Sequence, residues 1–130
     1  MIHFKAESEG VLRALDHYVE GCRTGSSAEL RKVFDEKATI CGHSPGGLMT
    51  EPIQTLYQWI DGNGPSPGVE AQIISVDILD SIAVARLELR KFSGTLAGED
   101  VAMSDAFTLL LIDGQWRIVH KIFHWHGLTK

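Results

Sequence analysis

Apolar positions in the first part of the chain recur every three or four residues. In residues 5–24 these positions are Val11, Leu12, Leu15, Tyr18, Val19 and Cys22. The spacing places them on one stripe of an amphipathic helix. Ser26 is followed three residues later by Glu29, which is the pattern of a capping box. A short second helix is therefore predicted in AELRKVF, with its apolar residues inward (Leu30, Val33 and Phe34).

Turn-forming residues dominate the next segment. ATICG is predicted to be a strand, HSPGG a turn, and residues 48–50 a short return strand, so that the two strands form a hairpin. Thr50 is a possible cap and Pro52 stands near the start of a third predicted helix, IQTLYQWI. The glycine- and proline-rich stretch DGNGPSPG ends that helix.

The pattern then changes to strand-like runs over residues 69–79, 82–93, 101–112 and 115–126. Short connections between such runs favour antiparallel neighbours. Helices first and strands afterwards indicate an α+β fold, in which N-terminal helices pack on a strongly curved antiparallel sheet. Residues 1–130 are expected to form one domain.

Strand pairing predicts which side chains share a face. With Asp113-Gly114 as a two-residue turn, opposite residues on the last hairpin sum to 227: Leu111 faces Trp116, Leu109 faces Ile118, Phe107 faces His120 and Asp105 faces Ile122. The same turn pairs Leu110 with Arg117, Thr108 with Val119 and Ala106 with Lys121 on the other face. Asp105 and His120 then become diagonal neighbours, about 7–8 Å apart, on the face that meets the helices.

A second two-residue turn at Asp80-Ser81 orders the preceding hairpin in the same way. It groups one apolar face: Val76, Ile78, Ala83, Ala85, Leu87 and Leu89. It directs Arg86, Glu88 and Arg90 outward.

Charge and composition narrow the classes of function. The chain has 130 residues, of which 44% are hydrophobic. Its net charge is -5, so no excess of positive potential favours binding to nucleic acid or to an anionic membrane. No apolar run is long enough for a signal peptide or a membrane span, and a cytoplasmic protein is expected. The two cysteines, Cys22 and Cys41, show no metal-type spacing and are expected to be reduced.

The order of these elements resembles the nuclear-transport-factor-2-like superfamily. The resemblance covers nearly the whole chain, with paired N-terminal helices, then FDEKATICG, a short helix, and long strands that end in DGQWRIVHKIF. LLLIDGQWRIVHKIF is most similar to the branch labelled "putative lumazine-binding", and somewhat to polyketide-cyclase-like relatives. The resemblance implies a cone-shaped pocket between helices and sheet and a homodimer. Its members range from isomerases and dehydratases to binding modules, so fold alone does not decide the function.

Asp105 and His120 are the candidate catalytic pair. A carboxylate that orients an imidazole makes a general base near neutral pH. The alternative is a buried hydrogen bond that serves only to satisfy polar groups. Tyr18 lies on the buried stripe of the first helix and either donates to a developing oxyanion in the same cavity or belongs to the core. Some isomerases of the superfamily similarly have a helix-one tyrosine that faces a sheet aspartate.

Aromatic residues and histidines are the candidate ligand contacts. The predicted ligand-binding residues are Tyr57, Trp59, Phe107, Trp116 and His124. Trp125 is predicted with Phe123 on the outer face of the sheet, as part of a subunit interface. His124 and His126 could share a metal ion, and so could His43 if its loop came near, but the ligand spacing is incomplete and no metal site is predicted.

Three classes of function stay open. The first is a homodimeric protein that binds a small apolar or aromatic molecule without chemistry. The second is a cofactor-free acid-base enzyme, an isomerase, dehydratase or cyclase that uses Asp105 and His120. The third is a protein-interaction module with an incidental pocket. A filled, closed core would favour this third class. No cofactor is expected, because the glycine-rich stretches match no phosphate-binding motif.

Overall fold

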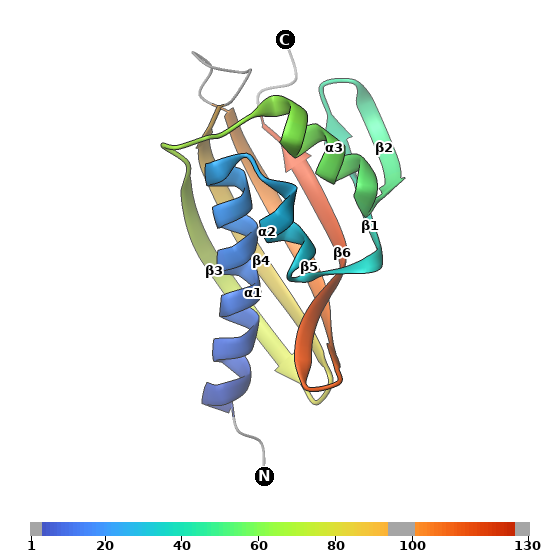
Figure 1. Cartoon of the computed structure of the whole chain (residues 1–130). Coiled ribbons are helices and arrows are strands. Elements are labelled where there is room, and N and C mark those ends of the chain that lie inside the picture. The colour runs from blue at the N-terminus through green and yellow to red at the C-terminus, as the bar shows by residue number, and fades with distance from the viewer. Residues whose placement is uncertain (1–3, 94–100, 127–130) are drawn as a thin grey trace.

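Helices cover one face of a curved six-stranded sheet in this chain (Figure 1). The computed structural model describes residues 4–93 and 101–126. Its elements are α1 (Phe4–Thr24), α2 (Ser27–Arg31), β1 (Phe34–Ser44), β2 (Gly47–Pro52), α3 (Ile53–Asn63), β3 (Glu70–Leu79), β4 (Ile82–Phe92), β5 (Val101–Ile112) and β6 (Gln115–Trp125). The spatial order of the strands is β2-β1-β6-β5-β4-β3. The α+β class predicted from the sequence is confirmed.

Helix starts follow the predicted order, with two local differences. Oγ of Ser26 accepts a hydrogen bond from the backbone N–H of Ala28 and so caps α2. The carboxylate of Glu29 binds His17 and Lys32. It therefore does not reach back to the backbone N–H of Ser26, and only the Ser26 half of the predicted capping box is formed. Thr50 is also not a cap, because it lies inside β2 and α3 begins directly after Pro52.

The sheet is mixed, which corrects the expectation of an antiparallel sheet. Four of its strand pairs are antiparallel, but β1 runs parallel to β6. The hairpin of β1 and β2 therefore joins the sheet through the C-terminal strand, far away in sequence. No local pattern encodes this pairing.

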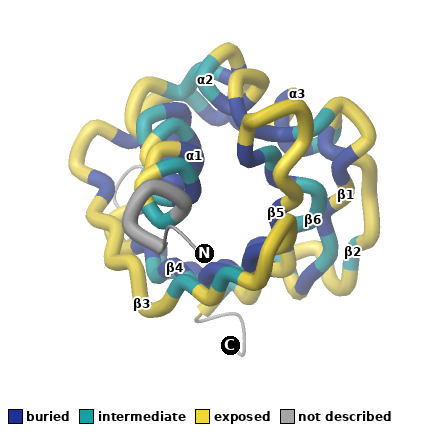
Figure 2. The backbone as a smooth tube through the Cα atoms, turned by 90° about the horizontal axis from the view of Figure 1, so that it is seen from below, coloured by how far each residue is buried: buried dark blue, intermediate teal, exposed yellow. Residues whose placement is uncertain are grey.

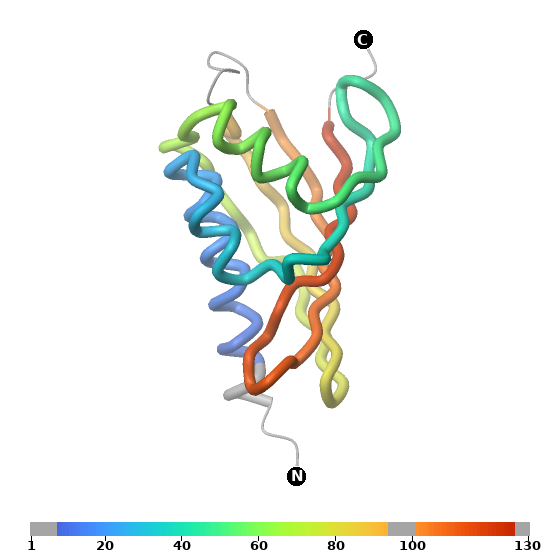
Figure 3. Tube along the Cα trace, turned by 45° about the vertical axis from the view of Figure 1, so that its right-hand side comes forward, coloured from blue at the N-terminus to red at the C-terminus, as the bar shows by residue number. Residues whose placement is uncertain are grey.

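The core lies between the concave face of the sheet and the helices. Viewed along the cone in Figure 2, the buried parts of the chain face the interior, and α1, α2 and α3 complete the ring opposite the sheet. α1 contacts β3 and β6, whereas α3 contacts β1 and β2. The turned view in Figure 3 shows α1 and α3 on one side of the strands and inclined to each other. The carboxylate of Asp61 ties α3 to α2, since it accepts hydrogen bonds from the N–H and Oγ of Ser27, each at 2.8 Å.

Both predicted two-residue hairpin turns are confirmed. Asp80 and Asp113 have φ of 53° and 49°, and Gly114 has φ of 79°, the left-handed conformations that such turns need. The first hairpin places its predicted apolar residues on the helix side of the sheet, with Ala83, Ala85, Leu87 and Leu89 buried.

A β-bulge at Val119 breaks the predicted register of the last hairpin. Opposite residues sum to 227 from the turn as far as Leu109 and Ile118, but Thr108 then pairs with His120 and the sum becomes 228. A bulge adds one unpaired residue to one strand and so exchanges the faces of all later residues. The predicted partners of Phe107, Asp105, Thr108 and Ala106 are therefore wrong.

Beyond the bulge, every residue of β6 points to the side opposite the predicted one. Lys121 lies opposite Phe107, and Phe123 lies opposite Asp105. Phe123 and Trp125 consequently face the helices, and the prediction of an outward Trp125 at a subunit interface is wrong. His120 faces the outer side of the sheet.

No helix in the part of the chain that the structure describes has both the length and the apolar character needed to cross a bilayer.

Candidate functional site

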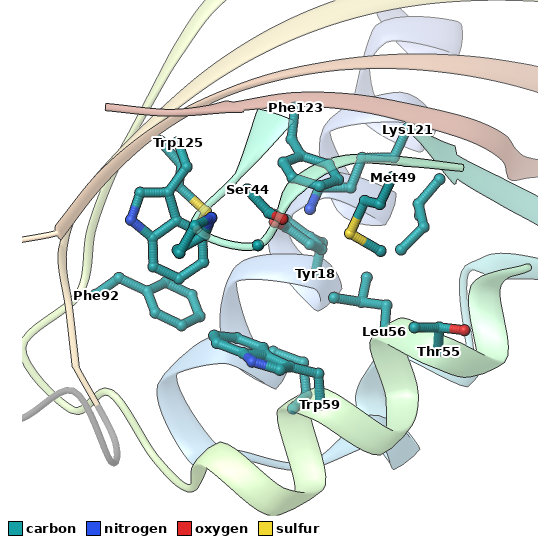
Figure 4. A pocket seen from close by; sticks show the side chains of 15 residues that line it. Tyr18, Ser44, Met49, Thr55, Leu56, Trp59, Phe92, Lys121, Phe123 and Trp125 are labelled. Carbon is teal, nitrogen blue, oxygen red and sulfur yellow. The ribbon is translucent and has the colours of Figure 1, made fainter. Parts of the chain in front are cut away.

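A cavity of about 350 Å³ opens between α3, the β1–β2 hairpin and the ends of β4, β5 and β6. It is lined by Tyr18, Ile40, Ser44, Pro45, Gly46, Met49, Thr55, Leu56, Trp59, Ile60, Phe92, Met103, Lys121, Phe123 and Trp125. Figure 4 shows this cavity from close by. Most of the lining side chains are apolar, and Lys121 is the one charged lining residue within residues 4–93 and 101–126.

Three aromatic rings form one wall of the cavity. The indole of Trp59, from α3, stacks on Phe92 with ring centroids 5.5 Å apart and planes inclined by 29°. Trp125, from β6, meets the same indole edge-on at 5.9 Å. Trp59 is 36% exposed and so stands at the mouth of the cavity. Of the predicted ligand contacts, Trp59 is the one that lines this cavity.

A buried polar cluster of Tyr18, Asp105 and Lys121 lies at the floor of the cavity, where Tyr18 and Lys121 line the cavity and Asp105 is fully buried beside them. The hydroxyl of Tyr18 donates to Oδ2 of Asp105 at 2.8 Å, which confirms that the helix-one tyrosine faces the sheet aspartate. Nζ of Lys121 lies 3.5 Å from Oδ1 of Asp105, and the two side chains are 4% and 0% exposed. Figure 4 shows the Lys121 amine beside the Phe123 ring and directed toward Tyr18.

Burial controls the protonation of this cluster. It raises the pKa of Asp105, although Lys121 and the Tyr18 hydroxyl act in the opposite direction. Burial also raises the pKa of Tyr18 well above its ordinary value, with Asp105 adding to the effect, so Tyr18 stays protonated as a donor. The neighbouring Cys22 thiol has its pKa raised to about 12 by burial and stays neutral.

His120 does not belong to this cluster, so the predicted Asp105–His120 pair is wrong. Nδ1 of His120 lies 2.7 Å from Oγ1 of Thr39, and both residues lie on the outer side of the sheet. The bulge at Val119 is the cause, because without it His120 and not Lys121 would stand opposite Phe107.

The other predicted ligand contacts lie outside the cavity. Tyr57 is buried with the Arg31 guanidinium 4.3 Å from its ring centre. Phe107 packs edge-on against the Tyr18 ring at 5.1 Å and so supports the floor from behind. Trp116 lines a separate hollow of about 210 Å³ beside α1. His124 is exposed on the outer face of the sheet.

Three histidines gather on that outer face. The ring of His124 lies 6.0 Å from that of His43 and 4.9 Å from that of His126. Within residues 4–93 and 101–126, no three or more His, Cys, Asp or Glu side chains are arranged to hold a metal ion.

Lys121, Phe123 and Trp125 are the site residues that the sequence analysis assigned to the wrong face or overlooked. A signal for them is present in the strand itself. Apolar residues occupy even positions up to Ile118, whereas the large aromatic residues Phe123 and Trp125 occupy odd ones. Such a change of phase within one strand indicates a bulge.

Comparison with known proteins identifies the family. A family model described as "Putative lumazine-binding" matches residues 6–124. The chain belongs to this family. A nuclear-transport-factor-2-like protein of unknown function from Shewanella baltica is 32% identical, with a TM-score of 0.88 over 98% of this chain and 99% of that one. A second such protein, from Methylobacillus flagellatus, is 33% identical, with a TM-score of 0.85 over 94% of each chain.

Among curated proteins, this member of the lumazine-binding family is similar to the aldolase FrzH from a Cladobotryum species. The two are 24% identical over 119 residues, which cover 92% of this chain and 91% of FrzH.

Proposed function

We propose that the cavity between α3, the β1–β2 hairpin and the ends of β4, β5 and β6 binds a small planar aromatic molecule. The observation that carries the proposal is the open cavity of about 350 Å³, which has an aromatic wall and, among the described residues that line it, one charged side chain, Lys121. Small-molecule sites are typically concave, mostly apolar and of about 300–1,000 Å³, with a few placed polar groups. A filled core would favour a protein-interaction module, and this core is open.

The wall favours a flat ring as the ligand. Trp59 and Trp125 meet nearly at right angles, with 83° between their planes, so a ring that stacks on one indole meets the edge or face of the other. Offset-stacked and edge-to-face contacts are the arrangements that aromatic rings prefer. The description of the family points to the same chemical class, since lumazine is a planar bicyclic ring system.

Lumazine is the probe for testing this proposal. Titration of the protein with lumazine should quench tryptophan fluorescence to saturation, because Trp59 and Trp125 line the cavity. Trp59→Leu should weaken the affinity by about tenfold, since one aromatic stacking contact contributes about 0.5–1.5 kcal/mol.

Trp116→Leu is the matched control, because Trp116 lines a different hollow. It should leave the lumazine affinity of the folded protein unchanged. Saturable binding that is equally insensitive to both substitutions would place the ligand elsewhere, and no binding of lumazine would count against the proposal.

An acid-base enzyme is the second candidate. It is supported by the buried Tyr18–Asp105 hydrogen bond of 2.8 Å at the floor and by the similarity to the aldolase FrzH. In this candidate Asp105 moves a proton next to a ligand carbonyl, and His120 takes no part. The test is exchange of the acidic C–H protons of 2-tetralone in deuterated water, followed by NMR. The protein should accelerate the exchange, and Asp105→Asn should abolish the acceleration.

We also propose that the protein is a homodimer joined through the outer face of its sheet. Several apolar residues of this face are substantially exposed: Ile82, Val84, Leu110 and Ile122. The described helices all contact the opposite face. An apolar sheet face without a covering layer is the usual setting for a symmetric partner.

A further inference from the structure

Lys121 is a buried amine whose hydrogen-bonding capacity is largely unused. In the part of the chain that the structure describes, its one charged neighbour is Oδ1 of Asp105, which lies 3.5 Å away, beyond the usual range for an N–H···O hydrogen bond. That oxygen has no hydrogen-bond partner among the described residues. The amine otherwise faces rings, with Nζ 5.2 Å from the centre of Tyr18 and 4.9 Å from that of Phe123.

Such a lysine is difficult to explain as a stabilising element. Burial of an ion pair costs desolvation energy that the attraction between the two charges seldom offsets completely. A protein with apolar side chains of similar volume in its place is often as stable. Lys121 also lines the cavity, so its amine can reach a bound molecule. An amine next to a carboxylate in an apolar site is suited to nucleophilic chemistry.

The cluster has the arrangement of an activated nucleophile. The nucleophile is the Lys121 amine, the adjacent base is Asp105 at 3.5 Å, and the group that orients the base is the Tyr18 hydroxyl at 2.8 Å. Nucleophilic lysines in proteins form Schiff bases with carbonyl compounds, and they are commonly held in apolar pockets.

We infer that Lys121 captures the aldehyde or ketone group of an aromatic ligand as a protonated imine. The inference rests on the proposed binding of a small aromatic molecule in this cavity, and it names the reactive group of that molecule. The aromatic wall of Trp59, Phe92 and Trp125 would hold the ring of the ligand, and the floor would receive its carbonyl group.

The groups at the floor balance the reaction without any co-reactant. The ammonium of Lys121 first gives one proton to the carboxylate of Asp105. The free amine then attacks the carbonyl carbon, and a proton moves from nitrogen to oxygen to give a carbinolamine. Asp105 returns its proton to the carbinolamine hydroxyl, which leaves as water while the nitrogen lone pair forms the C=N bond. The products are a protonated imine, one water molecule and the original carboxylate.

Reductive trapping tests the inference directly. The protein is incubated with 2-naphthaldehyde and sodium cyanoborohydride, digested with trypsin and analysed by mass spectrometry. Modified Lys121 should resist trypsin and appear in a peptide that spans residues 118–130, with the added mass of a naphthylmethyl group. We expect Lys121 to react about tenfold faster than the exposed Lys32, Lys37 and Lys91, because binding orients the aldehyde at the amine.

Matched substitutions separate capture from general lysine reactivity. Lys121→Met should remove the rapid labelling, and Lys91→Met should leave the labelling of Lys121 unchanged. If Lys121→Met does not fold because Asp105 is left unpaired, the double variant Lys121→Met/Asp105→Asn serves instead. Labelling of Lys121 that is no faster than that of the exposed lysines would overturn the inference.

Binding of 2-methylnaphthalene distinguishes this inference from the proposed function. This probe has the same rings and no carbonyl group, and its binding is followed by tryptophan fluorescence. If it binds and the aldehyde is not captured at Lys121, the imine inference fails and ring binding stands. If neither lumazine nor 2-methylnaphthalene binds, the proposed function fails as well.

Discussion

Asp105 links the stability of the fold to the chemistry of the cavity. It is fully buried on β5, its Oδ2 accepts from Tyr18, and its Oδ1 faces Lys121. A buried carboxyl group loses hydration when it ionises, and here this loss outweighs the nearby ammonium, so the pKa of Asp105 lies above its ordinary value of 3.8. Asp105 is consequently a better proton acceptor than an exposed aspartate.

The raised pKa of Asp105 predicts how stability depends on pH. The folded protein binds this proton more tightly than the unfolded chain does. The resulting stabilisation is fully present below the pKa of the unfolded chain and is lost as the pH rises through the higher pKa of the folded protein. The free energy of unfolding of the wild type should therefore fall, relative to that of Asp105→Asn, as the pH rises through this window.

Urea denaturation of both proteins at a series of pH values measures this difference. Asp105→Asn leaves Lys121 without its counter-charge, which lowers stability by an amount that is nearly constant while Lys121 stays charged, so the slope with pH is the quantity to compare. The opposite result would be a free energy of unfolding of the wild type that rises relative to that of the variant with increasing pH. It would show that the attraction of Lys121 outweighs burial and lowers the pKa of Asp105.

Strand β6 shows how one element decides the composition of the site. The bulge at Val119 brings Lys121, Phe123 and Trp125 to the concave face and removes His120 from it. The parallel pairing of β1 with β6 then holds this half of the strand in place. Gly42 lies opposite Phe123 in this pairing, and it leaves no room for a Cβ.

Gly42→Ala should therefore be strongly destabilising. A Cβ at this position would overlap the carbonyl oxygen of Phe123, and neither backbone can withdraw without breaking the β1–β6 pairing. We expect a loss of about 2–4 kcal/mol in the free energy of unfolding, measured by urea denaturation, which is within the range for severe overpacking.

Gly62→Ala is the control for that substitution. A Cβ there has no atom within 4 Å, and Gly62 lies in α3, where alanine is favoured over glycine by up to about 1 kcal/mol. The control should be neutral or slightly stabilising. An equally mild effect of Gly42→Ala would mean that the β1–β6 contact is looser than the structure indicates.

At the scale of the whole molecule, the helices pack on one face of the sheet, and no described element covers the opposite face. The interface proposed on that face does not include Phe123 and Trp125, because both side chains line the cavity on the other side of the sheet. Its centre is better marked by Ile122, which is 51% exposed and lies opposite Ala106.

Ile122→Glu should dissociate the proposed homodimer, because it places a charge within an apolar contact on both subunits. Sedimentation at tens of micromolar should show a dimer for the wild type and a monomer for this variant, with the fold retained. Ile73→Glu is the matched control, since Ile73 is 38% exposed and lies on the opposite face, paired with Leu87. A monomeric wild type would refute the proposal, as would equal dissociation by both variants.

Local patterns in the sequence determine much of this fold. The stripe of α1, the two hairpin turns and the faces of β3 and β4 follow from side-chain periodicity and from residues that tolerate positive φ, such as Asp80 and Gly114. These features depend on neighbours in the chain, so they can be predicted without the fold. The resemblance to isomerases of the superfamily suggests only by place in the fold that Tyr18 faces Asp105, and the structure joins the two side chains by a hydrogen bond of 2.8 Å.

Only the tertiary structure decided the cavity and its reactive floor. The parallel contact of β1 with β6 and the open space beneath α3 depend on segments far apart in sequence. The bulge at Val119 selects Lys121 over His120 as the partner of Asp105. The physical reason is that side chains alternate between the two faces of a strand, so a single unpaired residue exchanges the faces of all later residues in that strand. Packing of Phe123 and Trp125 against the helices then determines which face is buried.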